Sequence, residues 1–267
     1  MSNFLLRAAT AQDTEDIVRI WRDCFGDPPA LISELLMRAD LLTGAVVAEA
    51  DGGVRSAMFR FENLFFGENK AAYLYALCTA PAYRGRGLGR AVNRAIAEKC
   101  FENGAEIVFL SPADGALADW YARILGAKPL HGWHDTLLEA VDASAVCTAI
   151  SPEEYCKERR STLLLTQQLL RAQDILHRHC GGGFYRVALR GIAAIACVDT
   201  GELPLVRELI CPVEMRETIC AAIAAALGKP QILLREKVEN GAGLVYITNS
   251  HAAFSAKSYD GFFLNLE

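Results

Sequence analysis

The chain has 267 residues, a formal net charge of −5 and 52% hydrophobic residues. This length is ample for two domains with buried cores, and the acidic balance lacks the basic patch of a nucleic-acid-binding protein. No apolar run approaches the roughly 20 residues that cross a bilayer, and the N-terminus lacks a secretory signal pattern, so we expect a cytoplasmic protein with no membrane partner.

Nine cysteines are scattered along the chain without a Cys-x-x-Cys pair, and an odd number cannot all pair within one chain. Reduced thiols in a cytosol are therefore expected. The segment His177 to Cys180 contains two histidines and a cysteine, but no second group of ligands accompanies it. The sequence therefore predicts no metal site.

The N-terminal part predicts a strand, a helix and a hairpin. The strand covers Phe4–Ala9, the helix begins at a capping box of Thr10 and Asp13, and the hairpin joins Ala45–Ala50 to Val54–Phe61 about Asp51-Gly52-Gly53. One face of the helix is apolar, with Ile17, Ile20, Trp21 and Cys24 at helical spacing.

A segment with three alternate glycines and three arginines, Arg84 to Arg90, comes next between a predicted strand and a predicted helix. The strand is Ala71–Thr79, the helix has Leu88, Val92, Ile96 and Cys100 at helical spacing and ends at Asn103-Gly104, and Glu106–Leu110 is another buried strand. Glycines let a backbone approach a ligand, the N–H groups at a helix start hold anions, and arginines add charge-assisted hydrogen bonds. The order of elements predicts a parallel crossover with a phosphate-binding loop.

Two nucleotide motifs are excluded, because the dinucleotide fingerprint needs a glycine at Arg90 and the Walker loop needs Gly-Lys-Ser/Thr. The pattern Arg84-x-x-Gly87-x-Gly89 instead resembles motif A of the GNAT superfamily of N-acetyltransferases. The resemblance implies that the pyrophosphate of acetyl-coenzyme A is bound by Arg84, Gly85, Arg86, Gly87, Leu88, Gly89 and Arg90. The alternative is an ordinary glycine-rich turn with solvated arginines.

The same resemblance implies that the backbone of Leu77, Cys78 and Thr79 pairs with the pantetheine arm as an added strand would. The arm delivers the thioester carbonyl to a gap between strands, where a backbone N–H can polarise its oxygen. Cys78 could alternatively carry an acetyl group between two substrates, but a cysteine inside an apolar strand is typically inert core.

Candidate catalytic residues are less specific. Family members often carry a glutamate at the position of Tyr73, so Tyr73, Tyr75 and Glu62 are candidate bases, directly or through water, and aromatic strand residues also serve as pocket wall. Tyr121 matches the tyrosine that protonates the leaving thiolate in the family, although the spacing to Gly126 is one residue longer than the commonest form. The alternative for Tyr121 is a core position.

The second half repeats the order of elements. Trp133–Val141 predicts a last strand of the first domain, and Ser151-Pro152-Glu153-Glu154 begins one long helix that continues to Gly181-Gly182-Gly183. Predicted strands follow over Phe184–Arg190, Ile192–Val198, Leu203–Ile210, Gln231–Lys237, Leu244–Thr248 and Phe262–Leu266, with a helix over Val213–Leu227. This order resembles a degenerate GNAT-like half, although an unrelated small α+β domain would fit as well. Its loop, Cys211 to Glu217, has no glycine and two acids, so no second coenzyme site is expected.

We therefore expect an α/β (α+β) protein with a mixed central sheet and helices on both faces. The predicted domains are a catalytic GNAT domain over 1–145, a helical linker over 146–183 and a GNAT-like domain over 184–267. The predicted function is direct acetyl transfer from acetyl-coenzyme A to a primary amine of a small molecule or peptide, without a metal. A non-catalytic acyl-coenzyme A sensor is the alternative, and the second half would shape the acceptor side or form a homodimer interface.

Overall fold

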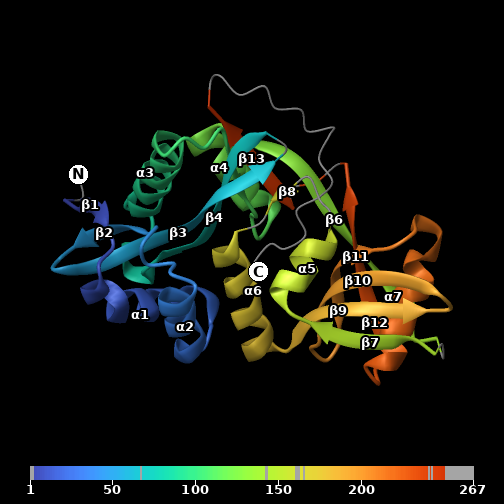
Figure 1. Ribbon diagram of the computed structural model, residues 1–267. Coiled ribbons are helices and arrows are strands. Elements are labelled where there is room, and N and C mark those ends of the chain that lie inside the picture. Colours follow the sequence, from blue (N-terminus) through green and yellow to red (C-terminus); the bar gives the residue numbers. More distant parts are fainter. Residues whose placement is uncertain are drawn as a thin grey trace. The chain divides into compact units, whose positions relative to one another are not determined.

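The structure is a computed structural model that describes residues 3–66, 68–141, 144–159, 163–164, 166–239, 241 and 243–249 (Figure 1). The chain divides into two units. The first unit holds the described residues of Met1–Leu130, Thr162–Ala172 and Gly241–Tyr259, and the second those of His131–Ser161 and Gln173–Asn240. These units do not follow the predicted boundaries at 145 and 183, because two later segments of the chain return to the first unit.

The sheet of the first unit has the strand order β1-β2-β3-β4-β5-β13. Its strands are β1 (Leu5–Ala8), β2 (Val46–Ala50), β3 (Gly53–Phe66), β4 (Asn69–Thr79), β5 (Ile107–Leu110) and β13 (Leu244–Thr248), and β8 (Leu163–Leu164) pairs with the end of β3. Neighbouring strands are antiparallel except for β4 and β5, which are parallel. The parallel crossover predicted around the glycine-rich loop is thus confirmed.

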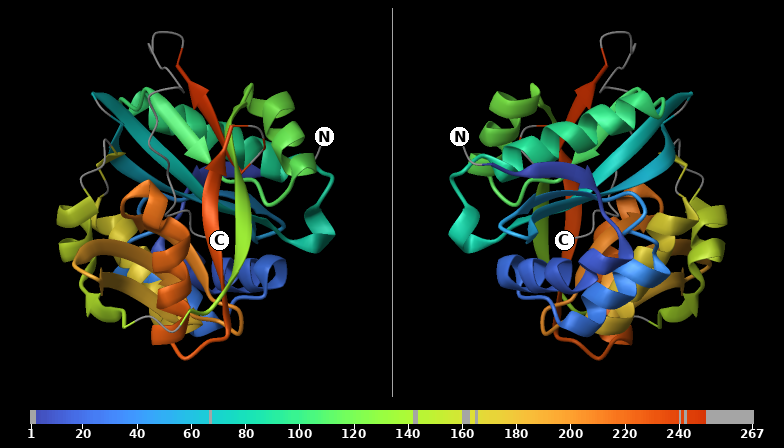
Figure 2. Two further views of the ribbon diagram at one scale, coloured as in Figure 1. Left: turned by 90° about the vertical axis from the view of Figure 1, so that its right-hand side faces the viewer. Right: turned by 90° about the vertical axis from the view of Figure 1, so that its left-hand side faces the viewer.

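Helices cover both faces of this sheet (Figures 1 and 2). They are α1 (Thr14–Phe25), α2 (Pro29–Arg38), α3 (Leu88–Glu102) and α4 (Gly115–Leu125), with short 3-10 turns η1 (Ala11–Asp13) and η2 (Pro81–Tyr83). The predicted capping box of Thr10 and Asp13 is confirmed, and α1 buries Ile17, Ile20 and Trp21 as expected. The sequence analysis missed α2, which Pro29 begins and which buries Leu31 and Leu35 at helical spacing.

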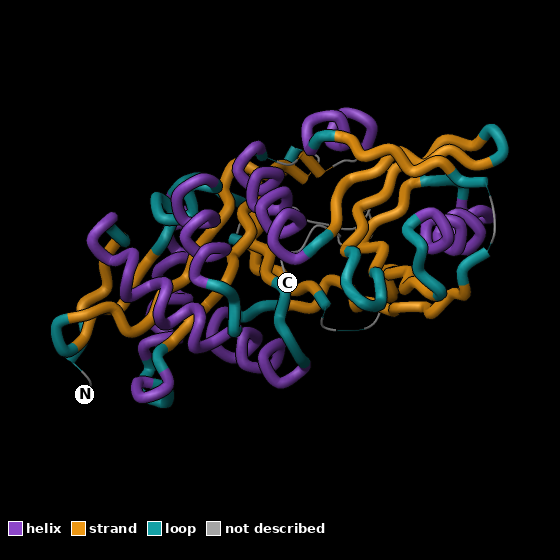
Figure 3. Tube along the Cα trace, turned by 90° about the horizontal axis from the view of Figure 1, so that it is seen from below, coloured by secondary structure: helices purple, strands orange, loops and turns teal. Residues whose placement is uncertain are grey.

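The second unit has the strand order β7-β9-β10-β11-β12-β6. Its elements are β6 (Lys128–Glu139), β7 (Val146–Ile150), α5 (Pro152–Arg159), α6 (Gln167–Cys180), β9 (Gly182–Leu189), β10 (Ile192–Asp199), β11 (Leu205–Ile210), η3 (Val213–Met215), α7 (Arg216–Ala226) and β12 (Gln231–Val238), of which β6 and α6 begin in the first unit. Neighbouring strands are antiparallel except for β11 and β12, which are parallel and joined through α7. Figure 3 shows helices flanking the strands.

The pairing pattern of the two units is the same. In each, antiparallel strands lead to a strand that pairs in parallel with the next one through a helix, and one antiparallel strand follows. That last strand comes from the other half of the sequence: β13 in the first unit and β6 in the second. The strand predicted over Leu244–Thr248 therefore forms, but in the sheet of the first unit.

One predicted element is wrong. The single long helix from Ser151 to Gly183 is two helices, α5 and α6, separated by β8. The capping box at Ser151 and Glu154 does form. The helix is interrupted because residues 163 and 164 pair with Phe66 and Phe65 in β3, a long-range contact that overrides local periodicity. The predicted strand Phe262–Leu266 lies outside the described residues.

Candidate functional site

Strands β4 and β5 separate at the centre of the first unit. Their parallel ladder joins Ala71–Leu74 to Ile107–Leu110 and ends there, whereas β4 continues to Thr79 paired only with β3 among the described residues. Ala76 has a positive φ of 52°, and the register with β3 shifts beside it. A non-glycine residue in this conformation bends the strand. The bend leaves the predicted arm-binding residues Leu77, Cys78 and Thr79 on the part of β4 that diverges from β5.

The predicted phosphate loop lies directly after this diverging segment. Gly85 and Gly87 have positive φ values of 75° and 90°, and a Cβ at either would meet only open space. Gly89 is different, because its Cβ would come 3.1 Å from the Thr79 hydroxyl. The glycines thus make the turn into α3 and let that helix start close to the end of β4.

The start of α3 can hold an anion. Gly87 is its N-cap residue, no acidic residue occupies the first turn, and residues Arg84 to Gly87 are exposed. The first backbone N–H groups of a helix have no intrahelical acceptor, and the helix dipole places positive charge there. An exposed glycine turn at this end is therefore a binding position for a phosphate group.

The arginines of the loop are not equivalent. Arg84 folds back, with its Nε donating to the Thr79 carbonyl at 3.2 Å and its Nη2 to the Cys24 sulfur at 3.4 Å. Arg86 stacks on the Tyr83 ring, 4.8 Å from its centroid. Arg90 is exposed on the first turn of α3. Arg84 therefore braces the loop against β4, while Arg86, on the Tyr83 ring, and Arg90 are exposed at the start of α3, where their guanidinium groups can bond to a phosphate.

Tyr121 belongs to the buried cluster that also contains Leu88 at the start of α3 and Leu110 at the end of β5. It is 7% exposed, and burial raises its pKa to about 12, an effect that the Asn93 side chain opposes. At neutral pH the phenol is therefore protonated and can act as a proton donor. Tyr121 is thus a core residue in a cluster that reaches the start of α3 and the end of β5, and its role as the proton donor stays a prediction.

Tyr73 and Tyr75 lie on the opposite face of β4. Tyr75 contacts the Trp21 ring edge-on at 5.6 Å between centroids, and Tyr73 stacks with Phe61 at 6.2 Å. Both tyrosines are buried. They pack as buried aromatic residues beneath α1, and a role for either as a base stays a prediction.

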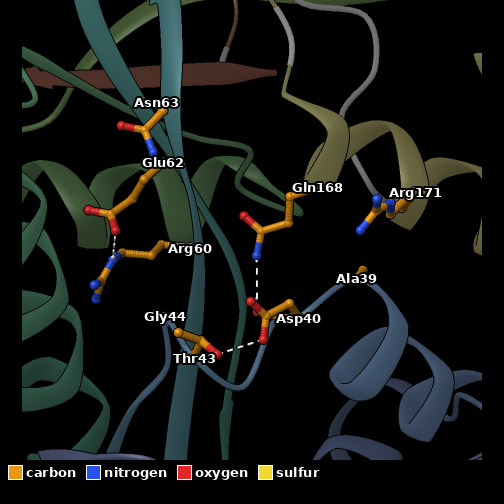
Figure 4. A pocket seen from close by; sticks show the side chains of 9 residues that line it. All are labelled: Ala39, Asp40, Thr43, Gly44, Arg60, Glu62, Asn63, Gln168 and Arg171. Atoms are coloured by element: carbon orange, nitrogen blue, oxygen red, sulfur yellow. Dashed lines mark hydrogen bonds and ion pairs between the residues drawn. The ribbon is translucent and has the colours of Figure 1, made fainter. Parts of the chain in front are cut away.

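Glu62 lies away from the loop. Its carboxylate accepts a hydrogen bond from the Asn103 amide at 2.8 Å and pairs with Arg60 at 3.1 Å. Asn103 caps the C-terminal end of α3, about 20 Å from the loop at 1.5 Å per helical residue. Glu62 also lines a cavity of about 340 Å³ with Gln168 and Arg171 from α6 (Figure 4). The structure therefore does not bring Glu62 together with Tyr121.

Cys78 is fully buried, and burial raises the pKa of its thiol far above the usual range. Its sulfur donates to the Ala57 carbonyl at 3.6 Å. A thiol in this setting is a poor nucleophile, because the thiolate is the reactive form.

One polar residue of the site was missed by the sequence analysis. Asn93 of α3 is fully buried, and neither of its side-chain polar atoms has a hydrogen-bond partner in the described part of the chain. The signal was available, because Asn93 lies next to Val92 and three residues before Ile96 on the apolar face of the predicted helix. An amide on such a face is unusual, since buried polar groups are normally paired.

Two further observations concern the described part of the chain. It contains no group of three or more histidine, cysteine, aspartate or glutamate side chains arranged to hold a metal ion. None of its helices combines the length and apolarity needed to cross a membrane.

Comparisons with known proteins agree with this geometry. Residues 6–123, less than half of the chain, match the family described as acetyltransferase (GNAT) domain. No curated protein matches the chain. The chain is similar in fold to a GCN5-related N-acetyltransferase from Kribbella flavida, with a TM-score of 0.65 and 15% identity over 91% of this chain and 70% of that one.

Two other solved structures show the same likeness. A conserved protein of unknown function from Enterococcus faecalis, described as a probable N-acyltransferase, has a TM-score of 0.68 and 11% identity over 93% of this chain and 73% of that one. A putative acetyltransferase from Pyrococcus horikoshii has a TM-score of 0.62 and 15% identity over 94% and 91%. The chain therefore has the GNAT fold, and its residues 6–123 are similar to the acetyltransferase (GNAT) domain family.

Proposed function

We propose that this protein is an N-acetyltransferase that moves an acetyl group from acetyl-coenzyme A directly to a primary amine of a small molecule or peptide. The observation that carries the proposal is the divergence of β4 from β5 beside the exposed glycine loop at the start of α3. Acetyl-coenzyme A fits this arrangement. Its pyrophosphate needs an anion site such as the glycine loop, and its extended amide arm needs an unpaired strand backbone beside that loop.

In this proposal the pyrophosphate binds at Gly85 to Gly89 with Arg86 and Arg90, and Arg84 keeps the loop against β4. The pantetheine arm pairs with the backbone of Leu77 to Thr79. The amine nitrogen then attacks the thioester carbon, and a backbone N–H of the bent strand stabilises the charge on the carbonyl oxygen. As the carbon–sulfur bond breaks, Tyr121 gives its proton to the sulfur and regains one from solvent.

The amine must lose a proton to become a nucleophile. Glu62 is held at the far end of α3, and Tyr73 is buried among aromatic rings. We therefore assign this proton to water that reaches the strand gap. The rate should then rise tenfold per pH unit until the pKa of the bound amine is reached. A plateau well below that pKa would instead indicate a protein base.

None of the nine cysteines forms a disulfide in the part of the chain that the structure describes, which supports a reducing compartment such as the cytoplasm. The second unit, which has the same strand pairing and lies outside the matched residues 6–123, is proposed as a degenerate GNAT-like half that shapes the acceptor side or a homodimer interface. Because buried Cys78 is a poor nucleophile, we favour direct transfer over an acetyl-cysteine intermediate.

The test is a panel of amines: diamines, amino acids, peptides with a free N-terminus and peptides containing lysine. Each is incubated with acetyl-coenzyme A, and the acetylated amine and free coenzyme are measured by mass spectrometry, because the exposed Cys180 would react with thiol reagents. Turnover with equal amounts of the two products supports the proposal. Calorimetry of acetyl-coenzyme A binding is run in parallel.

A sensor of acyl-coenzyme A is the second candidate. The placement of Glu62 and Tyr73 favours it, since neither stands at the strand gap as a base. Tight coenzyme binding without turnover of any amine would support the sensor and contradict the enzyme. Absence of binding would contradict both.

A further inference from the structure

The Asn93 amide is fully buried and has no hydrogen-bond partner among the described residues. It lies on α3 between Val92 and Ile96, which belong to a buried hydrophobic cluster. Burying an amide without hydrogen bonds costs stability, so such a group in a native core calls for an explanation. A leucine of similar size would fill the same space without that cost.

Tyr121 of α4 belongs to the same buried cluster as Val92 and Ile96, the neighbours of Asn93 on α3. The two helices are tied together beside Asn93, because the Arg94 Nε donates to the Ile124 carbonyl at 3.0 Å. Asn93 also counteracts the rise that burial causes in the pKa of Tyr121, so the amide lies near the phenol. The Asn93 amide nonetheless makes no hydrogen bond to another described residue. Hydrogen bonds of catalytic groups often close only in the complex with substrate.

We infer that Asn93 is a positioning residue for the proposed acid Tyr121, an inference that rests on the proposed function. The Asn93 Nδ2–H donates to the Tyr121 oxygen and so directs the phenolic O–H toward the coenzyme sulfur. When the proton moves from the Tyr121 oxygen to the sulfur, the same N–H stabilises the negative charge left on the phenolate oxygen. Asn93 itself exchanges no proton.

Activity and stability should move in opposite directions in Asn93→Leu. We expect kcat to fall about tenfold or more while KM for acetyl-coenzyme A changes by less than about threefold. The thermal unfolding midpoint should stay or rise, because an unpaired buried amide is removed. A structural role for Asn93 predicts the reverse: a lower midpoint and unchanged kcat. Asn93→Ala, which is smaller, repeats the kinetic test if the leucine does not fit.

A double-mutant cycle separates positioning from a general disturbance of the site. In the Tyr121→Phe background, Asn93→Leu should cause no further loss of kcat, because the hydroxyl on which it acts is gone. If the double mutant instead loses kcat by the product of the two single-mutant factors, the inference is overturned. Gln173→Leu is the matched control: it also removes a buried amide with an unpaired oxygen, from α6, and should leave kcat unchanged.

A second measurement does not depend on turnover. In protein labelled with ¹³Cζ-tyrosine, the Tyr121 resonance is assigned by its absence in Tyr121→Phe, and acetyl-coenzyme A is added. We expect Asn93→Leu to shift that resonance and Gln173→Leu to leave it in place. An unchanged resonance in Asn93→Leu overturns the inference even if the protein proves to be a sensor. If the unmodified protein turns over no amine, only the proposed enzymatic function is overturned.

Discussion

The two units contain the same kind of strand gap and differ in what fills it. In the second unit the parallel ladder of β11 and β12 joins only Leu205–Val206 to Leu233–Leu234, and the register of β11 with β10 shifts just beyond it. Arg216, the first residue of α7, closes the gap that follows. Its Nη1 donates to the Leu209 carbonyl at 3.0 Å on β11, and its Nε pairs with Glu236 on β12 at 3.2 Å.

The loops beside the two gaps differ as well. The first unit has glycines with positive φ and no acid at the helix start, whereas the second has η3, with Glu214 in η3 and Glu217 in the first turn of α7. A side chain that bonds to both strands takes the place that an extended arm would need, and the acids repel phosphate. The fold alone therefore does not make a coenzyme site. Whether the coenzyme can bind depends on the residues of the loop and on whether a side chain such as Arg216 occupies the strand gap.

The largest expected effect is that of Gly87→Glu. It sets a side chain and a negative charge where the backbone must approach the pyrophosphate. Each charge-assisted hydrogen bond lost costs about 1.5–3 kcal/mol, so acetyl-coenzyme A affinity should fall by at least about a hundredfold. Titration calorimetry of the folded variant measures this.

The control for that substitution is Val213→Glu in the corresponding loop of the second unit, where Val213 is 80% exposed. It should leave the affinity unchanged. Near-normal affinity in Gly87→Glu would mean that Arg84 to Arg90 is only a turn, and both the enzyme and the sensor would then be rejected.

A smaller effect distinguishes the capping boxes that begin η1 and α5. Asp13 is buried and held by Arg7 through two hydrogen bonds of 2.7 Å, and Arg7 lowers the pKa of Asp13 to about 2. Asp13→Asn should lower the free energy of unfolding at pH 7 by about 2 kcal/mol. Because the folded pKa lies below the unfolded value of 3.8, this stabilisation is complete above about pH 4 and disappears as the pH falls through about 2.

Urea unfolding at pH 7 and at pH 2 measures the difference between the variant and the original protein. The counterpart in the second unit is Glu154→Gln, whose carboxylate is exposed at the Ser151 capping box. That substitution should change stability far less. If Asp13→Asn and Glu154→Gln lower the free energy of unfolding equally, then burial of the carboxylate does not set the size of the effect.

The smallest effect is expected for Arg216→Ala, which opens the gap of the second unit. The ion pair with Glu236 is partly exposed, so the loss of stability should be about 1 kcal/mol. Acetyl-coenzyme A should still bind once per chain with unchanged affinity, because the second loop lacks glycines. Calorimetry reports the stoichiometry, and a second binding event would show that Arg216, rather than the loop, prevents binding.

Local chemistry let the sequence by itself determine several features of this protein. The capping boxes at Thr10 and Ser151 depend on side chains within three residues of a backbone N–H, and both form. The turn at Gly87 depends on a conformation that glycine adopts without strain. The crossover of β4, α3 and β5 follows from apolar periodicity. Each of these features depends on residues that are close in the sequence, so the sequence alone is enough to predict it.

Only the tertiary structure decided the features that depend on distant partners. The break between α5 and α6 comes from pairing with β3, and β13 joins the first unit because β5 offers it an edge. The bend at Ala76, a residue with no conformational preference of that kind, is imposed by the register of β3 against β4. Glu62 is held at the far end of α3 by Asn103, and Asn93 is buried on α3 without a hydrogen-bond partner among the described residues. Packing and strand pairing outweigh local preference in each case, because they involve more buried surface and more hydrogen bonds than any single residue contributes.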